Sequence, residues 1–188
     1  MKVEETNLKG VLIIYPDVFA DGRGFFFESY NKVKYKPYEI PEIFVQDNIS
    51  KSRKNTVRGL HYQVGEYAQG KLCQVVYGKV LDVAVDLRKS SPTFLKYTSA
   101  VLSDENHCQI WIPVGFAHGF SVLSDEAVFH YKCTQFYSKD HERTLYYADD
   151  EIGIDWKVEK AIVSEKDLTA KKIRDIGLDD ISHQYFFK

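Results

Sequence analysis

The sequence predicts an all-β protein in which many short strands form a sandwich or a barrel. Aromatic residues are abundant, with 12 Phe, 13 Tyr and 2 Trp against a single Met among 188 residues, and aromatic side chains favour strands over helices. Turn residues close the apolar runs at short intervals, which is typical of sandwiches and barrels. The length suits a single domain, residues 1–188, and no linker or internal repeat divides it.

Each predicted strand is an apolar or alternating run that ends at a turn residue. Between Lys79 and Leu87, for example, every second residue from Leu81 is apolar, whereas Asp82 and Asp86 lie on the other face. The strands are predicted over Val11–Tyr15, Gly24–Tyr30, Ile43–Ser50, Thr56–Gln63, Lys71–Tyr77, Lys79–Leu87, Tyr97–Leu102, Cys108–Ile112, Gly119–Leu123 and Ala127–Phe136.

One helix is predicted near the C-terminus. Ser164 is a preferred N-cap residue, and Asp167 stands three residues later, in the place of the Glu or Gln of a capping box. The helix is expected to continue from Leu168 to Asp175 and to end before Gly177.

Charge and apolar content exclude several classes of protein. The 25 Lys and Arg residues against 27 Asp and Glu residues give a net charge of −2, which predicts no nucleic-acid partner. No apolar run approaches the ~20 residues that cross a bilayer, so no membrane association is expected. The polar N-terminal segment does not resemble a signal peptide, and an odd number of widely spaced cysteines predicts free thiols in a cytoplasmic protein. These cysteines are Cys73, Cys108 and Cys133.

Two stretches carry polar residues that a strand alone does not require. Arg23 stands between two glycines at a turn, where its guanidinium could clamp a phosphate or simply be solvated. Alternation on the strand ending at Gln63 places Gly59, His61 and Gln63 on one face and Arg58 on the other. That face could form a polar pocket with His61 as a catalyst, although a lone histidine also fits a structural role.

A third stretch bears on metal binding. Pro113, Gly115 and His118 have the spacing of the second motif of the cupin barrel, in which the histidine often binds a metal. The first cupin motif would need a His-x-His pair and a nearby Glu, whereas this chain has His61-Tyr62-Gln63. Because this ligand set is incomplete, we predict no metal site.

Seven strings, in order along the chain, closely resemble the dTDP-4-dehydrorhamnose 3,5-epimerase family. The resemblance runs from about residue 3 to Trp156 and continues loosely toward the C-terminus. The strings are Phe19-x-Asp21-x-Arg23-Gly24-x-Phe26-x-Glu28, Gln46-Asp47-Asn48, Arg58-Gly59-Leu60-His61-Tyr62-Gln63, Gln69-Gly70-Lys71, Val83-Ala84-Val85-Asp86-Leu87-Arg88, Pro113-x-Gly115-Phe116-Ala117-His118-Gly119-Phe120 and Tyr131-Lys132.

The resemblance implies a cupin-type jelly-roll β-barrel with short C-terminal helices that forms a homodimer by strand exchange. It implies epimerisation at C3 and C5 of a dTDP-linked 4-keto-6-deoxy sugar, without a metal or another cofactor. By the same resemblance His61 is the general base, Tyr131 the acid on the opposite face of the sugar, and Lys71 the cation near the C4 oxygen. Asp167 would orient His61, a role that competes with its place in the capping box.

The resemblance also implies a set of substrate-binding residues. Tyr137 would stack on thymine, and two arginines would neutralise the diphosphate. The segment Arg143–Asp150 departs from the family's usual string, which leaves open another nucleotide-linked 4-keto deoxysugar or heptose as substrate. The implied binding residues are Arg23, Glu28, Gln46, Asp47, Asn48, Arg58, His118, Tyr137, Glu142 and Lys166.

Three other functions remain open on the sequence alone. The proton-exchanging residues fit a 3-epimerase that acts at one carbon equally well. A metal-dependent cupin oxygenase would need the ligands that are missing beside His61, and a sugar-nucleotide binder would need no catalyst at all.

Overall fold

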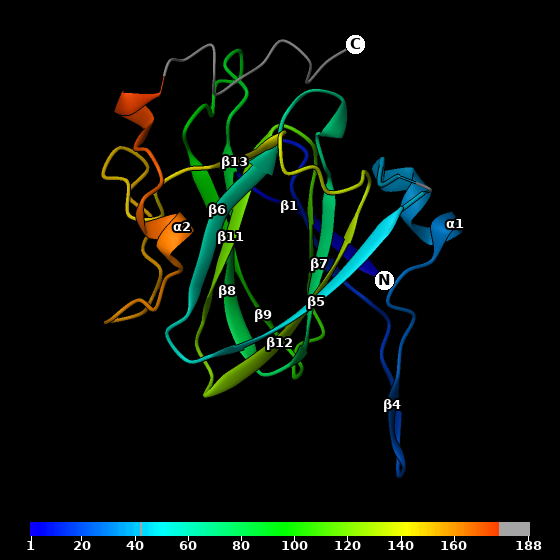
Figure 1. Cartoon of the computed structure of the whole chain (residues 1–188). Helices are drawn as coiled ribbons and strands as arrows, with labels where there is room; N and C mark the ends of the chain where they lie inside the picture. Colours follow the sequence, from blue (N-terminus) through cyan, green and yellow to red (C-terminus); the bar gives the residue numbers. More distant parts are fainter. Residues whose placement is uncertain (42, 177–188) are drawn as a thin grey trace.

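The computed structural model describes residues 1–41 and 43–176, and it shows two antiparallel sheets that face each other (Figure 1). The six-stranded sheet has the order β1 (Lys2–Glu5), β2 (Leu12–Tyr15), β10 (Gln109–Ile112), β7 (Lys71–Tyr77), β12 (Glu126–Cys133) and β5 (Gln46–Arg53). The five-stranded sheet has the order β13 (Glu142–Thr144), β6 (Val57–Gln63), β11 (Phe116–Val122), β8 (Lys79–Asp86) and β9 (Tyr97–Ser103). The predicted all-β class is confirmed, and the fold is a cupin-type jelly roll.

The remaining elements are short. A hairpin of β3 (Phe19–Asp21) and β4 (Gly24–Phe26) extends away from the two sheets, at the lower right of Figure 1. The helices are α1 (Lys32–Tyr35) and α2 (Glu165–Leu168), with 3-10 turns η1 (Lys36–Tyr38), η2 (Gly65–Tyr67) and η3 (Ile173–Asp175). Among the described residues, no helix has both the length and the apolar character needed to cross a bilayer.

Apolar side chains fill part of the space between the sheets. Val75 and Phe129 point inward from the six-stranded sheet and pack with Val80 and Phe120 of the five-stranded sheet. A second apolar cluster, which includes Val83 and Trp156, covers the other face of the five-stranded sheet. Because strand side chains alternate between faces, the five-stranded sheet is buried on both sides, and polar side chains at its inner face are held in a rigid setting.

The predicted C-terminal helix is wrong beyond its first turn. The N-cap at Ser164 is present, but α2 ends at Leu168 instead of Asp175. Lys171 pairs as an isolated bridge with Leu145, and its carbonyl accepts a hydrogen bond from Tyr146. This extended pairing is incompatible with a continuous helix, since a helical carbonyl would bond within its own segment. Gly177, the expected stop, lies outside the described residues.

The strand predictions hold for the two sheets except at their ends. The predicted strand Gly24–Tyr30 stops at Phe26, and short strands β1, β3 and β13 were not predicted. β13 has three residues without an apolar pattern, and it forms because its backbone pairs with β6. The helix α1 was also missed; Asn31 caps it by accepting hydrogen bonds from Val33 and Lys34.

Candidate active site

The site is a cleft between the two sheets. Two adjoining cavities, with empty volumes of about 440 and 730 Å³, share Asn48, His61, Lys71 and Tyr131 in their walls. The residues that the sequence analysis linked to proton transfer therefore border one continuous space.

His61 and Tyr131 reach this cleft from opposite walls. His61 lies on β6 of the five-stranded sheet, and Tyr131 lies on β12 of the six-stranded sheet. Lys71 begins β7, which pairs with β12, and its Nζ lies 5.8 Å from the centre of the Tyr131 ring. Burial raises the pKa of Tyr131 to about 12. A protonated phenol with an ammonium beside it thus faces an imidazole.

Asp167 holds the imidazole of His61. Its Oδ1 lies 2.6 Å from His61 Nε2, and its Oδ2 accepts a hydrogen bond of 3.3 Å from the backbone N–H of Gly59. Although burial alone would raise its pKa, the hydrogen bond and charge of His61 hold the pKa of Asp167 below its usual range. The carboxylate is 2 % exposed, so it is a fixed, ionised partner for the ring.

The expected competition between the two roles of Asp167 resolves in favour of His61. The carboxylate turns to His61 and Gly59, and the capping hydrogen bond runs from the Asp167 N–H to the Ser164 hydroxyl, at 3.2 Å. Only this half of a capping box is needed to start α2. The single turn of α2 therefore serves to present Asp167.

A bulge in β6 brings Arg58 to the same cleft as His61. His61 pairs with His118 on β11, but Arg58 pairs with Phe120, so β6 has one residue more than β11 across this interval. Gly59 has φ +128°, and a Cβ there would lie 2.6 Å from a backbone atom of β11. The prediction that Arg58 faces away from His61 is therefore wrong, because the bulge shifts the alternation by one residue.

The inner face of β5 supplies amide and hydroxyl groups. Gln46 and Asn48 line the cleft, and Gln46 Oε1 accepts a hydrogen bond from the backbone of Tyr137. Ser50, next on the same face, also lines the cleft, and its hydroxyl is buried without a protein partner among the described residues. Ser50 was not predicted from the sequence; the two-residue spacing after Gln46 and Asn48 was the signal that could have identified it.

Glu142 links the cleft to α2. Its Oε2 accepts a hydrogen bond of 3.1 Å from Tyr137 Oη and forms an ion pair of 2.5 Å with Lys166 Nζ. Burial alone would raise the pKa of Glu142, but the charge and hydrogen bond of Lys166 lower it. Both Tyr137 and Glu142 line the cleft, so three of the predicted binding residues form one connected group.

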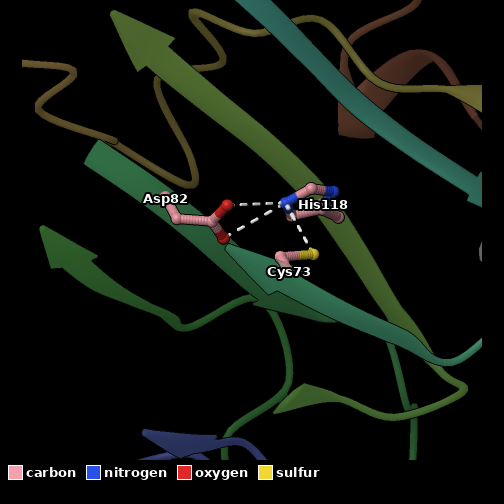
Figure 2. A group of neighbouring side chains, drawn as sticks. All are labelled: Cys73, Asp82 and His118. Carbon is pink, nitrogen blue, oxygen red and sulfur yellow. Dashed lines mark hydrogen bonds and ion pairs between the residues drawn. The ribbon is translucent and has the colours of Figure 1, made fainter. Parts of the chain in front are cut away.

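His118 lies at the cleft wall, and Figure 2 shows its two neighbours, Asp82 and Cys73, which are both buried. Its Nε2 lies 3.0 and 3.1 Å from the two oxygens of Asp82 and 3.9 Å from Cys73 Sγ. Burial raises the pKa of Asp82 and lowers that of His118. Cys73 and Asp82 were not among the predicted site residues, because nothing in a single strand links them to His118.

Four predicted binding residues do not line the cleft, and one of them, Lys166, reaches it through its ion pair with Glu142. Asp47 points to the other face of β5, where Lys132 Nζ lies 2.8 Å from its carboxylate. Arg23 sits in the turn of the β3–β4 hairpin, bound to Asp21, with 91 % of its side chain exposed. Glu28 follows this hairpin and pairs with Lys34. Alternation along β5 turns Asp47 away from Gln46 and Asn48, and its role in binding stays a prediction.

The segment Arg143–Asp150 does not line either cavity. Leu145 exchanges two backbone hydrogen bonds with Leu60, and it packs with Tyr147 in the apolar cluster on the other face of the five-stranded sheet. The segment that departs from the family's string therefore lies outside the described walls of the cleft.

Comparison with known proteins agrees with this geometry. The family model of dTDP-4-dehydrorhamnose 3,5-epimerase matches residues 5–175. A relative of that name from Shigella flexneri is 53 % identical over 93 % of this chain and 97 % of its own length. A crystal structure of the Elizabethkingia anophelis dTDP-4-dehydrorhamnose 3,5-epimerase superposes with a TM-score of 0.88 at 49 % identity, covering 93 % of this chain and 97 % of that one.

A second structure was solved with a sugar nucleotide. It is dTDP-6-deoxy-D-glucose-3,5-epimerase from Legionella pneumophila in complex with dTDP-4-keto-L-rhamnose, with a TM-score of 0.91, 45 % identity and 95 % coverage of both chains. The family model spans every strand of the two sheets in full except the edge strand β1, of which it includes the last residue. The chain belongs to the dTDP-4-dehydrorhamnose 3,5-epimerase family.

Proposed function

We propose that this protein epimerises a dTDP-linked 4-keto-6-deoxy sugar at C3 and C5. The observation that carries the proposal is the placement of His61 and Tyr131 on opposite walls of one cleft, with Lys71 beside them. Inversion of a carbon requires that a proton leaves from one face and another arrives on the other face. Family membership supplies the substrate class.

His61 acts as the base in this proposal. Because Asp167 occupies Nε2, Nδ1 is the nitrogen that can accept a proton. The electrons of the broken C–H bond move toward the C4 carbonyl of the sugar, so an enolate forms as the proton passes to His61 Nδ1. The Lys71 ammonium stabilises the developing charge on the C4 oxygen, and a positioned base contributes ~10²–10⁴-fold to the rate.

Tyr131 returns a proton to the opposite face of the carbon. Its pKa of about 12 keeps the phenol protonated at neutral pH, as a proton donor must be. The enolate collapses to the ketone when carbon takes this proton, and the phenolate and imidazolium exchange protons with water before the second carbon reacts. The same sequence at the second carbon completes the reaction, and no step needs a metal or a redox cofactor.

The polar walls of the cleft bind the rest of the substrate. Arg58 provides a cation for the diphosphate, and Tyr137 provides a ring for the thymine. Asn48 and the unpartnered hydroxyl of Ser50 offer hydrogen bonds. His118, Gln46, Glu142 and Lys166 complete the proposed binding set.

We propose that the working enzyme is a homodimer. The β3–β4 hairpin exposes Phe19, Phe25 and Phe26, the last at 66 %, on a segment that extends away from the sheets (Figure 1). Such an aromatic surface favours burial against a partner. Insertion of the hairpin into a second copy would bring Arg23 and Glu28 to its cleft. Each copy is proposed to be one domain, residues 1–188; the cytoplasmic location stays a prediction.

The dimer proposal is tested by complementation. The Arg23→Ala and His61→Asn variants are each expected to be inactive as pure proteins. Mixed after partial unfolding and refolding together, they should regain activity, because a mixed dimer carries one cleft with His61 and an intact Arg23. A monomer by light scattering, or no recovery on mixing, would contradict the proposal.

The reaction is tested by proton NMR of the dTDP-4-keto sugar in D2O. Deuterium is expected at both C3 and C5 with wild-type protein, and at neither position with His61→Asn, which should still bind dTDP. Deuterium at C3 alone would indicate a 3-epimerase. No incorporation with the wild type would indicate a binder without catalysis, and loss of turnover after treatment with a chelator would indicate a metal-dependent cupin.

A further inference from the structure

We propose that Cys73, Asp82 and His118 form a Zn²⁺-binding site at the wall of the cleft, and that an ion bound there inhibits the enzyme. The three donor atoms come from β7, β8 and β11 and lie within 4.8 Å of one another. Figure 2 shows His118 between the carboxylate and the thiol, with its Nε2 directed at both.

The spacing of the donors is close to that of a zinc site. Zinc binds nitrogen at ~2.0–2.1 Å, oxygen at ~2.0–2.2 Å and sulfur at ~2.3 Å, with tetrahedral angles between the bonds. In such a site the nitrogen lies roughly 3.3 Å from the oxygen and roughly 3.6 Å from the sulfur. The corresponding separations here are 3.0 and 3.1 Å for nitrogen to oxygen and 3.9 Å for nitrogen to sulfur. Shifts of a few tenths of an ångström would allow both pairs to bind one ion.

The chemistry of the donors selects the ion. A thiolate, an imidazole and a carboxylate suit Zn²⁺, whereas Mg²⁺ and Ca²⁺ prefer oxygen ligands alone. Cys73 and Asp82 are fully buried and His118 is 6 % exposed. A divalent cation would balance the thiolate and the carboxylate, which avoids leaving a buried charge uncompensated. Binding releases the thiol proton to solvent, so affinity increases with pH.

The cleft gives the ion a path to the three donors. The inhibitory role rests on the proposed function, because the ion would lie at the wall of the same cleft as the substrate. His118 borders the same cavity as His61, Lys71 and Tyr131, so an ion can enter where the sugar does. Three protein ligands leave a fourth position for water. The bound ion and its water would occupy space next to Lys71 and remove His118 from substrate binding.

The proposed site differs from the sequence-based prediction of no metal site. That prediction considered only the two cupin motifs, from which this site uses His118 alone. Of the other two donors, Cys73 lies on β7 of the six-stranded sheet and Asp82 on β8 of the five-stranded sheet. Their proximity depends on how the sheets face each other, which no spacing along the chain reveals.

The test uses the untagged full chain, stripped with a chelator and titrated with Co²⁺ as a spectroscopic substitute for Zn²⁺. We expect one equivalent to bind with a near-ultraviolet thiolate-to-cobalt band, and Zn²⁺ to displace it. Cys73→Ala and Cys73→Ser should each lose the band and bind Zn²⁺ at least about 100-fold more weakly, since even an outer-shell change costs 10–100-fold. Cys108→Ala removes another buried thiol and should behave as the wild type.

Inhibition is measured on the same proteins by NMR turnover. One equivalent of Zn²⁺ should suppress the wild type and Cys108→Ala, and it should leave Cys73→Ala, which keeps its basal activity, unaffected. The proposed site would be overturned if the wild type showed no cobalt band or if the band persisted in Cys73→Ala. Equal Zn²⁺ affinity of the wild type and Cys73→Ala would also overturn it. Binding without inhibition would overturn the inhibitory role. An enzyme inactive toward every 4-keto sugar would refute the proposed function, while the cobalt band still decides the site.

Discussion

Replacement of Asp167 by Asn tests the proposed base most directly, because it changes one proton position and little else. The Gly59 N–H needs an acceptor, so the Asn oxygen takes the place of Oδ2 and the amide NH2 faces His61 Nε2. Nε2 must then accept a hydrogen bond, which places the ring proton on Nδ1. The nitrogen that should receive the substrate proton is thereby blocked.

The size of the effect follows from two contributions. Loss of a hydrogen bond to a charged group costs ~1.5–3 kcal/mol, which at about 1.4 kcal/mol per tenfold corresponds to roughly 10–150-fold in rate. Blocking the base removes up to the ~10²–10⁴-fold that positioned proton transfer contributes. We therefore expect kcat to fall by about 10²–10⁴-fold for Asp167→Asn, with dTDP binding retained.

The assay is deuterium incorporation at C3 and C5 in D2O, combined with calorimetric binding of dTDP. Asp155→Asn is the matched control, since this carboxylate is exposed and pairs only with Lys157 among the described residues. A thermal melt checks that Asp167→Asn is folded. If the variant incorporates deuterium at more than a tenth of the wild-type rate, His61 is not the base in the tautomer argued here.

Four further outcomes are expected. Tyr131→Phe should lose inversion but keep deuterium exchange at C3 and C5, because His61 remains as the base. Since the pKa of Tyr131 is about 12, the wild-type rate should not decline through phenol ionisation near pH ~10; such a decline would contradict the assignment. Lys71→Met should lower kcat by ~10²–10³-fold, and a change in KM alone would indicate only a binding role. Gly59→Ala should lower the free energy of unfolding by about 1–3 kcal/mol in urea, whereas Gly22→Ala, in open space, should not. Asp82→Asn should reduce kcat less than tenfold, and a loss equal to that of Asp167→Asn would refute this.

Local sequence was sufficient for most strands because their burial alternates or is continuous along the strand. The strand Lys71–Tyr77 was predicted with the bounds that the structure shows. The errors occur where a partner strand sets the outcome. β13 exists through pairing with β6, and the chain after Leu168 leaves the helix to pair with Leu145. The paired segments are far apart in the chain, so a local sequence pattern does not reveal their pairing.

The site shows the same division between local and long-range information. Resemblance identified His61, Lys71 and Tyr131, and the structure places all three on one cleft. Strand alternation misplaced Arg58, because the bulge at Gly59 depends on its contact with β11. The cleft of one chain also lacks Arg23, which lies on the projecting hairpin.

The two His–Asp pairs of the cleft differ in what else holds the carboxylate. Asp167 is bound by both His61 and the Gly59 N–H, so an Asn there has one orientation and dictates the wrong tautomer. Within residues 1–41 and 43–176, the hydrogen bonds of both Asp82 oxygens go to His118 alone. An Asn at this position can rotate its oxygen toward Nε2 and keep the native hydrogen bond. The charge of Asp82 is thus dispensable for orienting His118, while the charge of Asp167 also stabilises the imidazolium that forms when His61 takes the proton.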